Sequence, residues 1–130
     1  MSYFLIVFSL ALLMNASGWA ESLHAVRPLP GYVCMQLALT PAQLTDPKVG
    51  VPVREAPNNA AKVVGYAANT VIAETKPHLT AGFRQVLRAD GETGWIDAKY
   101  LRPWSNPFAP TARCSPAIMS DGKPGFGTVR

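Results

Sequence analysis

The stretch DGETGWIDAKYLRPW, residues 90 to 104, follows the β-rich run FRQVLRA and carries the strongest fold signal in the chain. Asp-Gly between two β-rich runs is typical of a two-residue hairpin turn, because both positions tolerate a positive φ. A turn at Asp90-Gly91 would pair Val86 with Trp95, and Arg84 with Asp97. Each such cross-strand pair contributes about 0.2–1 kcal/mol. The sequence therefore predicts a hairpin over residues 83–97, followed by one helical turn or a last short strand.

Short β-rich segments also precede the hairpin. Residues 49–55 place three valines on one face at period two, and residues 62–66 and 70–75 are β-rich, with turn residues between them. Residues 32–39 form an apolar run that fits a strand or an extended clamp, and Thr40-Pro41 predicts one helical turn that ends by Pro47. This pattern predicts an all-β domain, either a small barrel or a sandwich, with too few strands for an immunoglobulin-like sandwich.

The N-terminus reads as an export signal. From Tyr3 to Met14 every residue but Ser9 is apolar, and small residues lead to a cleavage pattern that ends at Ala20. The run is short for a bilayer core of about 30 Å, so a signal peptide is favoured over a membrane anchor. No Lys or Arg precedes the run, which departs from the usual pattern. We expect a mature chain that begins near Glu21, is periplasmic or secreted, and has no stable membrane span.

The formal net charge is +4, and the Lys and Arg residues are scattered singly along the chain. A mild positive excess suits anionic partners such as cell-wall polymers or membrane surfaces, and it also fits an ordinary solvated surface. Nucleic-acid binding needs a basic cluster or stripe, and the sequence has neither. The charge pattern therefore gives no support for a nucleic-acid partner.

Two cysteines, Cys34 and Cys114, bracket most of the chain. In an exported chain an even pair predicts a disulfide, and closing so long a loop stabilises the fold by about 4.5 kcal/mol in the chain-entropy model. A metal site would need clustered ligands, whereas His24 and His78 stand alone. A catalytic thiol would need a histidine partner, and free thiols are rare in oxidising compartments. We expect a disulfide and no metal or cofactor.

Residues 49 to 103 resemble the bacterial SH3 family. The resemblance is carried by Val-Arg near the start, Val64-Gly65 in the middle, and Gly94-Trp95-Ile96 followed by Tyr100-Leu101. Departures are Phe83 where a Trp is usual, Ala68-Asn69 in place of a Lys-Gly type of turn, and a long loop over residues 76–82. The resemblance implies an SH3-like, partly open β-barrel. Together with the export signal and the composition of the two ends, it predicts a signal peptide over residues 1–20, an N-terminal flank over 21–48, the barrel over 49–104 and a Pro/Gly-rich tail over 105–130. The cysteines would join the two irregular flanks. The whole chain also resembles small exported bacterial proteins of unknown function that carry one such domain.

The resemblance implies a binding role, in which such domains dock on peptidoglycan or an extended peptide. Aromatic and polar residues would line the groove, and the candidate ligand-binding residues are Tyr66, Phe83, Arg84, Tyr100 and Trp104. Arg84 and Arg88 could attract carboxylates, or pair with Asp97 or solvent. Trp95 is interpreted as a core residue on Val86. Tyr100 fits either groove or core, and Trp104 either the surface or packing under the tail.

An enzyme would need a nucleophile with a base, paired acids or a metal site. Asp90 and Glu92 lie on a turn tip, and the sequence has no Gly-rich phosphate loop and no Gly-x-Ser-x-Gly motif. The sequence therefore predicts a non-catalytic binding module. The alternative is a periplasmic accessory protein that binds another protein through its barrel edge or its tail.

Overall fold

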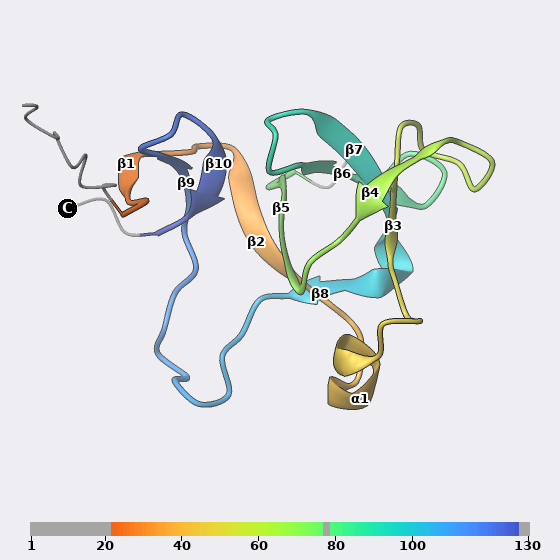
Figure 1. The fold of residues 1–130 in the computed structure, drawn as a ribbon, viewed down its shortest axis with the longest axis horizontal. Helices are drawn as coiled ribbons and strands as arrows, with labels where there is room; N and C mark the ends of the chain where they lie inside the picture. Colours follow the sequence, from red (N-terminus) through yellow and green to blue (C-terminus); the bar gives the residue numbers. More distant parts are fainter. Residues whose placement is uncertain (1–21, 77–78, 128–130) are drawn as a thin grey trace, which may run out of the picture.

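A computed structural model describes residues 22–76 and 79–127, and Figure 1 shows their strands in two groups. The predicted signal peptide lies outside the described residues. Within them, the chain forms ten strands, one α-helix and one 3-10 turn. In chain order these are β1 (Ala25–Pro28), β2 (Tyr32–Leu37), α1 (Pro41–Thr45), β3 (Pro52–Arg54), β4 (Val63–Tyr66), β5 (Thr70–Glu74), β6 (Phe83–Leu87), β7 (Thr93–Asp97), η1 (Ala98–Tyr100), β8 (Leu101–Pro103), β9 (Pro116–Met119) and β10 (Pro124–Phe126).

Seven strands form an antiparallel sheet in the order β4-β3-β7-β6-β5-β2-β8. Side chains from β2, β3, β5, β6 and β7 meet in one hydrophobic cluster, so the sheet curls around a single core. The end strands β4 and β8 do not pair with each other, which leaves the barrel partly open. The predicted all-β class and partly open barrel are confirmed. The cluster consists of Leu37, Val51, Val53, Val71, Ala73, Val86 and Ile96.

The β6–β7 turn has three residues, where the sequence predicted two. Arg88 N–H donates to the Glu92 carbonyl at 2.8 Å, and Gly91, at φ +87°, donates to the Arg88 carbonyl at 2.9 Å. These bonds describe a type I turn that ends in a glycine bulge, a common three-residue hairpin loop. Asp90 supports it by accepting the Glu92 N–H at 2.9 Å.

The extra turn residue shifts the pairing by one position, so the predicted Val86–Trp95 and Arg84–Asp97 pairs are wrong. Val86 lies opposite Gly94, and Gln85 lies opposite Trp95. A shift of one residue moves a side chain to the other face of the sheet. Ile96 and Val86 therefore point into the core, and Trp95 lies half-buried on the outer face. The interpretation of Trp95 as a core residue on Val86 is corrected accordingly.

The two flanks form a three-stranded antiparallel sheet in the order β1-β9-β10. The tail, predicted to be irregular, instead contains the β9–β10 hairpin. Its turn repeats the β6–β7 geometry: Met119 N–H donates to the Lys123 carbonyl, Gly122 has φ +81°, and Asp121 accepts the Lys123 N–H. The tail therefore has a second Asp-Gly turn of the same kind.

Strand β2 lies between the barrel core and the tail. Because successive side chains of a strand point to opposite faces, alternate residues of β2 face the core and the tail. Met35 and Leu37 contact the barrel core. On the other face, the buried Cys34 forms the predicted disulfide with Cys114, across a sequence separation of 80 residues. The buried Gln36 exchanges two hydrogen bonds with the Ser105 main chain, at 3.1 and 3.3 Å. The C-terminal tail is therefore held on strand β2 at two points.

The short helix α1 begins as predicted. Thr40 caps it by accepting the Gln43 N–H at 3.2 Å, the Gln43 side chain accepts the Thr40 N–H at 2.9 Å, and Pro41 occupies the first helical position. This reciprocal capping box satisfies two main-chain donors at the helix start. No helix in the described part of the chain is long and apolar enough to span a bilayer.

We expect Gly94→Ala to lower the free energy of unfolding by about 1–3 kcal/mol, the usual range for overpacking. A Cβ at this position would clash with Val53 Cγ1 in the neighbouring strand β3. Gly65→Ala is the matched control, since its Cβ would meet nothing within 4 Å. Urea unfolding of both variants tests this, and equal stability of the two would contradict the packing account.

We expect the protein to show no free thiol under denaturing conditions, because Cys34 and Cys114 are bonded. Removing the bond by Cys34→Ser with Cys114→Ser should lower the free energy of unfolding by up to about 4.5 kcal/mol. Thiol titration in denaturant, followed by urea unfolding, measures both. Two titratable thiols in the wild-type protein would refute the assignment.

Candidate functional site

A cavity of about 430 Å³ lies between the barrel and the β9–β10 hairpin. Its floor is apolar and is made by core side chains that include Val53, Val86 and Ile96. One wall is the end of β4 with the following turn, and the opposite wall is β10. This volume falls within the range of small-ligand sites in proteins, about 300–1,000 Å³.

Both walls of the cavity are edge strands. Within the described sheets, β4 pairs only with β3, and β10 pairs only with β9. The Ala67 N–H donates to the Val51 carbonyl, and Gly65 lies opposite Val53. Since an antiparallel strand alternates its hydrogen-bonding direction, the main-chain groups of Tyr66 point away from β3. The cavity is therefore bordered by backbone that can accept another strand.

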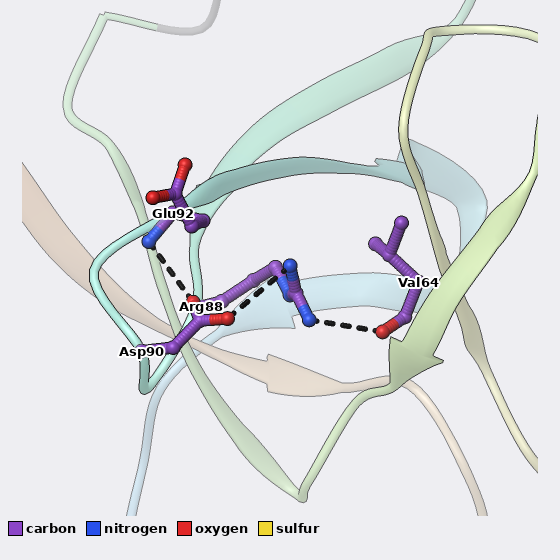
Figure 2. A network of polar contacts seen from close by, with 4 residues as sticks. All are labelled: Val64, Arg88, Asp90 and Glu92. Atoms are coloured by element: carbon purple, nitrogen blue, oxygen red, sulfur yellow. Dashed lines mark hydrogen bonds and ion pairs between the residues drawn. The ribbon is translucent and has the colours of Figure 1, made fainter.

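Arg88 links the β6–β7 turn to the free edge of β4 (Figure 2). Its Nη2 donates to the Val64 carbonyl at 2.9 Å, and its Nη1 lies 3.4 Å from Asp90 Oδ2. Asp90 in turn accepts the Glu92 N–H. Arg88 and Asp90 are also the charged residues among those that line the cavity. The two charged side chains lie at the rim of the cavity, and the floor of the cavity is apolar.

A second hollow of about 480 Å³ adjoins the cavity on the side of the two Asp-Gly turns. The two hollows share Ala89, Asp90, Pro124 and Gly125 as lining residues. Asp121 and Lys123 add charge to the second hollow. The two hollows together extend the site from the apolar barrel interior to a polar border between the hairpins.

Tyr66 is the one predicted site residue that lines the cavity. Its side chain is 71% exposed, and its ring lies against Gly50, where an added Cβ would be 2.8 Å from Tyr66 Cδ1. An aromatic ring that is held on one side and open on the other is a suitable contact surface for a ligand. Phe126, on the opposite wall, is also exposed.

The structure places the other aromatic candidates away from this cavity. Phe83 is 5% exposed and belongs to the buried interior. Tyr100 packs partly against the core cluster, with Lys99 Nζ 5.0 Å from its ring centroid. Trp104 is half-buried just after β8. The four aromatic candidates therefore do not form one groove.

Arg84 also lies outside the cavity. Its Nη2 donates to the Glu74 carbonyl at 2.7 Å, and its Nη1 approaches Met35 Sδ at 3.6 Å. Its Nε is buried without a hydrogen-bond partner in the described part of the chain. Burial lowers the pKa of Arg84, and the charge of Glu74 partly offsets this effect. The guanidinium is thus directed into the protein, toward β5 and β2, and not toward Asp97.

Sequence reasoning missed the wall that the tail supplies. Residues 124–126 were assigned to an irregular tail, yet they line the cavity as β10. The signal that could have revealed this strand is Asp121-Gly122, the same dipeptide that marked the β6–β7 hairpin. Nothing local in the sequence shows that this hairpin packs beside Tyr66 and Arg88, because that contact depends on tertiary structure.

Comparisons with protein-family models, with curated proteins and with solved structures find no match to this chain. The evidence for a function therefore comes from the geometry of the site. Among the described residues, no group of three or more His, Cys, Asp or Glu side chains lies close enough together to hold a metal ion.

We expect Arg88→Gln to lower the free energy of unfolding by about 1 kcal/mol, the usual net value of one hydrogen bond. The shorter side chain gives up the bond to the Val64 carbonyl and frees the edge of β4. Arg102→Gln, at an exposed position of β8, should stay within about 0.5 kcal/mol of wild type. Urea unfolding compares the two variants. Equal stabilities would show that Arg88 does not hold β4.

Proposed function

We propose that this chain is a non-catalytic, exported binding domain that docks on an extended peptide, such as the stem peptides of peptidoglycan. The observation that carries the proposal is the ligand-sized apolar cavity between two edge strands. The cavity supplies hydrophobic contact, and the strand edges supply main-chain hydrogen bonds. Together they match the way in which sheet edges bind extended peptides.

The apolar floor favours a ligand with a small or medium apolar side chain. A peptide bound along β4 would alternate its side chains, so that every second one faces the cavity. Val53, Val86 and Ile96 would contact that side chain and remove it from water. Tyr66, with its ring exposed at the wall, would cover it from the side.

The charges at the rim favour a ligand that carries a carboxylate. Arg88 Nη1 faces Asp90 at 3.4 Å, a long ion-pair distance, and both side chains are partly exposed. A ligand carboxylate could replace Asp90 as the partner of Arg88, because exposed ion pairs are weak, about 0–1 kcal/mol. The formal net charge of +4 adds a general attraction to anionic polymers.

Two further features support an exported, wall-associated role. The Cys34–Cys114 disulfide is typical of oxidising compartments, and the sequence begins with a segment that reads as a signal peptide. Residues 49 to 103 resemble the bacterial SH3 family, whose implied role is peptidoglycan binding. We propose membership of that family on the Gly94-Trp95-Ile96 and Tyr100-Leu101 segments.

The same free edges also suit a second candidate, a periplasmic accessory protein. A partner protein could add a strand to β4 or β10, because neither strand is covered on its outer side within the described sheets. That partner would contact the strand edge, whereas a stem peptide would need the cavity behind it. The residues affected by binding therefore separate the two candidates.

We expect the exported chain to be retained on purified peptidoglycan, and Tyr66→Ala to bind about tenfold more weakly, as for a typical aromatic contact residue. Leu79→Ala, which removes a 56% exposed side chain from the β5–β6 loop, is the control and should bind as wild type does. Sedimentation with peptidoglycan at low and high salt measures retention. No retention at low salt would sink the wall-binding proposal.

A titration with soluble stem-peptide fragments, followed by amide NMR, locates the contact. Shifts are expected at residues 65–67, 88–90 and 124–126 and also at the floor residues Val53, Val86 and Ile96, since all of these line the cavity. Shifts along β4 without any at its apolar floor would favour the accessory-protein alternative.

A further inference from the structure

The connection between β8 and β9 is a closed loop whose two ends are fixed on one strand. At its start, the Ser105 main chain is bonded twice to Gln36. At its end, Cys114 is bonded to Cys34. Gln36 and Cys34 are two positions apart on the same buried face of β2, so the ends of the loop lie close together. Loops of this kind, called Ω-loops, are frequently functional.

The interior of this loop, residues 105–114, is ordered by consecutive turns. The Ala109 N–H donates to the Asn106 carbonyl at 3.1 Å, and the Ala112 N–H donates to the Ala109 carbonyl at 2.9 Å. The Asn106 side chain also accepts the Phe108 N–H at 3.0 Å. A proline follows Asn106 and another follows Ala109, each at the turn position where its fixed φ fits. The loop is therefore preorganised by its own turns.

This loop displays an aromatic ring to solvent. Phe108 is 97% exposed, more than any other large apolar side chain in the described part of the chain. In Figure 1 the β8–β9 connection extends away from both sheets. A preorganised loop loses little conformational entropy when its exposed side chain is buried by a partner. Phe108 is thus suited to act as an insertion point.

The charge around the loop has one sign. From residue 98 to residue 120 the sequence has Lys99, Arg102 and Arg113 and neither Asp nor Glu, and of these three Lys99 pairs with Asp97 at 3.7 Å. Arg102 is opposite Gln36 on β2, and Arg113 precedes the bonded Cys114, so both exposed arginines flank the base of the loop. An apolar tip next to cationic side chains suits the surface of an anionic lipid bilayer, which has charged headgroups outside and hydrocarbon beneath.

We propose that residues 105–114 anchor the protein on the surface of an anionic lipid bilayer. Phe108 enters the boundary between headgroups and acyl chains, and Arg102 and Arg113 lie against the anionic headgroups. The one-sign charge favours this surface over a pocket on a protein, since no complementary pattern of both signs is present. Membrane attachment by this loop does not involve the cavity, so it can be tested independently of peptide binding.

Flotation with vesicles tests the proposal, using the exported protein and vesicles of phosphatidylglycerol and phosphatidylcholine in equal parts. We expect wild type to bind these vesicles at low salt, and to bind vesicles of phosphatidylcholine alone much more weakly. Phe108→Ala should bind about tenfold more weakly, which corresponds to about 1.4 kcal/mol. Arg113→Ala should bind about fivefold more weakly, as for one cation near the surface.

Leu79→Ala, which removes a different exposed apolar side chain, should bind the vesicles as wild type does. All variants carry the same N-terminus, so any contribution from that end is equal in every sample. Thermal unfolding confirms that each variant is folded. Absence of binding to anionic vesicles, or equal binding by wild type and Phe108→Ala, would overturn the proposal and leave a protein partner as the reason for the exposed ring.

Tryptophan emission gives a second measurement that does not depend on overall affinity. The emission difference between Phe108→Trp and wild type isolates the residue at the loop tip from the native tryptophans. We expect a blue shift and reduced acrylamide quenching on addition of anionic vesicles. An unshifted difference spectrum with vesicle-bound protein would show that the tip stays in water, against the proposal.

Discussion

The hydrogen bond from the Arg88 N–H to the Glu92 carbonyl closes the β6–β7 turn and fixes the register of its two strands. That register sends Val86 and Ile96 into the core and leaves Gly94 beneath Val53. The same turn directs the Arg88 side chain toward β4, where its Nη2 donates to the Val64 carbonyl. A single turn therefore sets the packing of the barrel and the rim of the cavity beside it.

Strand β2 carries the second constraint, because both of its faces are buried against different parts of the chain. One face packs on the barrel core, and the other holds the tail through the disulfide of Cys34 and the paired hydrogen bonds of Gln36. These attachments hold the tail against the barrel and fix the ends of the 105–114 loop. The position of the cavity wall at β10 and the exposure of Phe108 thus both depend on strand β2.

The proposed activities use different parts of this arrangement. Peptide binding would use the apolar cavity and the free edges of β4 and β10. Attachment to a lipid surface would use the tip and the cationic base of the 105–114 loop. An exported protein with both would hold a wall peptide close to a membrane surface. The two kinds of contact involve separate residues, so variants can remove one and keep the other.

Local chemistry in the sequence determined the strand segments of the barrel, the Thr40 helix cap and the Cys34–Cys114 bond, since each depends on periodicity, short-range hydrogen bonding or the pairing of two cysteines. The Asp90-Gly91 dipeptide also indicated the β6–β7 turn, but Asp-Gly fits both two-residue and three-residue loops. The position of Trp95 outside the core depends on the register that the strands adopt in the folded protein. Tertiary structure alone decided which aromatics meet a cavity. Tyr66 lines it and Phe83 is buried, because that outcome depends on which elements pack around each side chain in the folded protein.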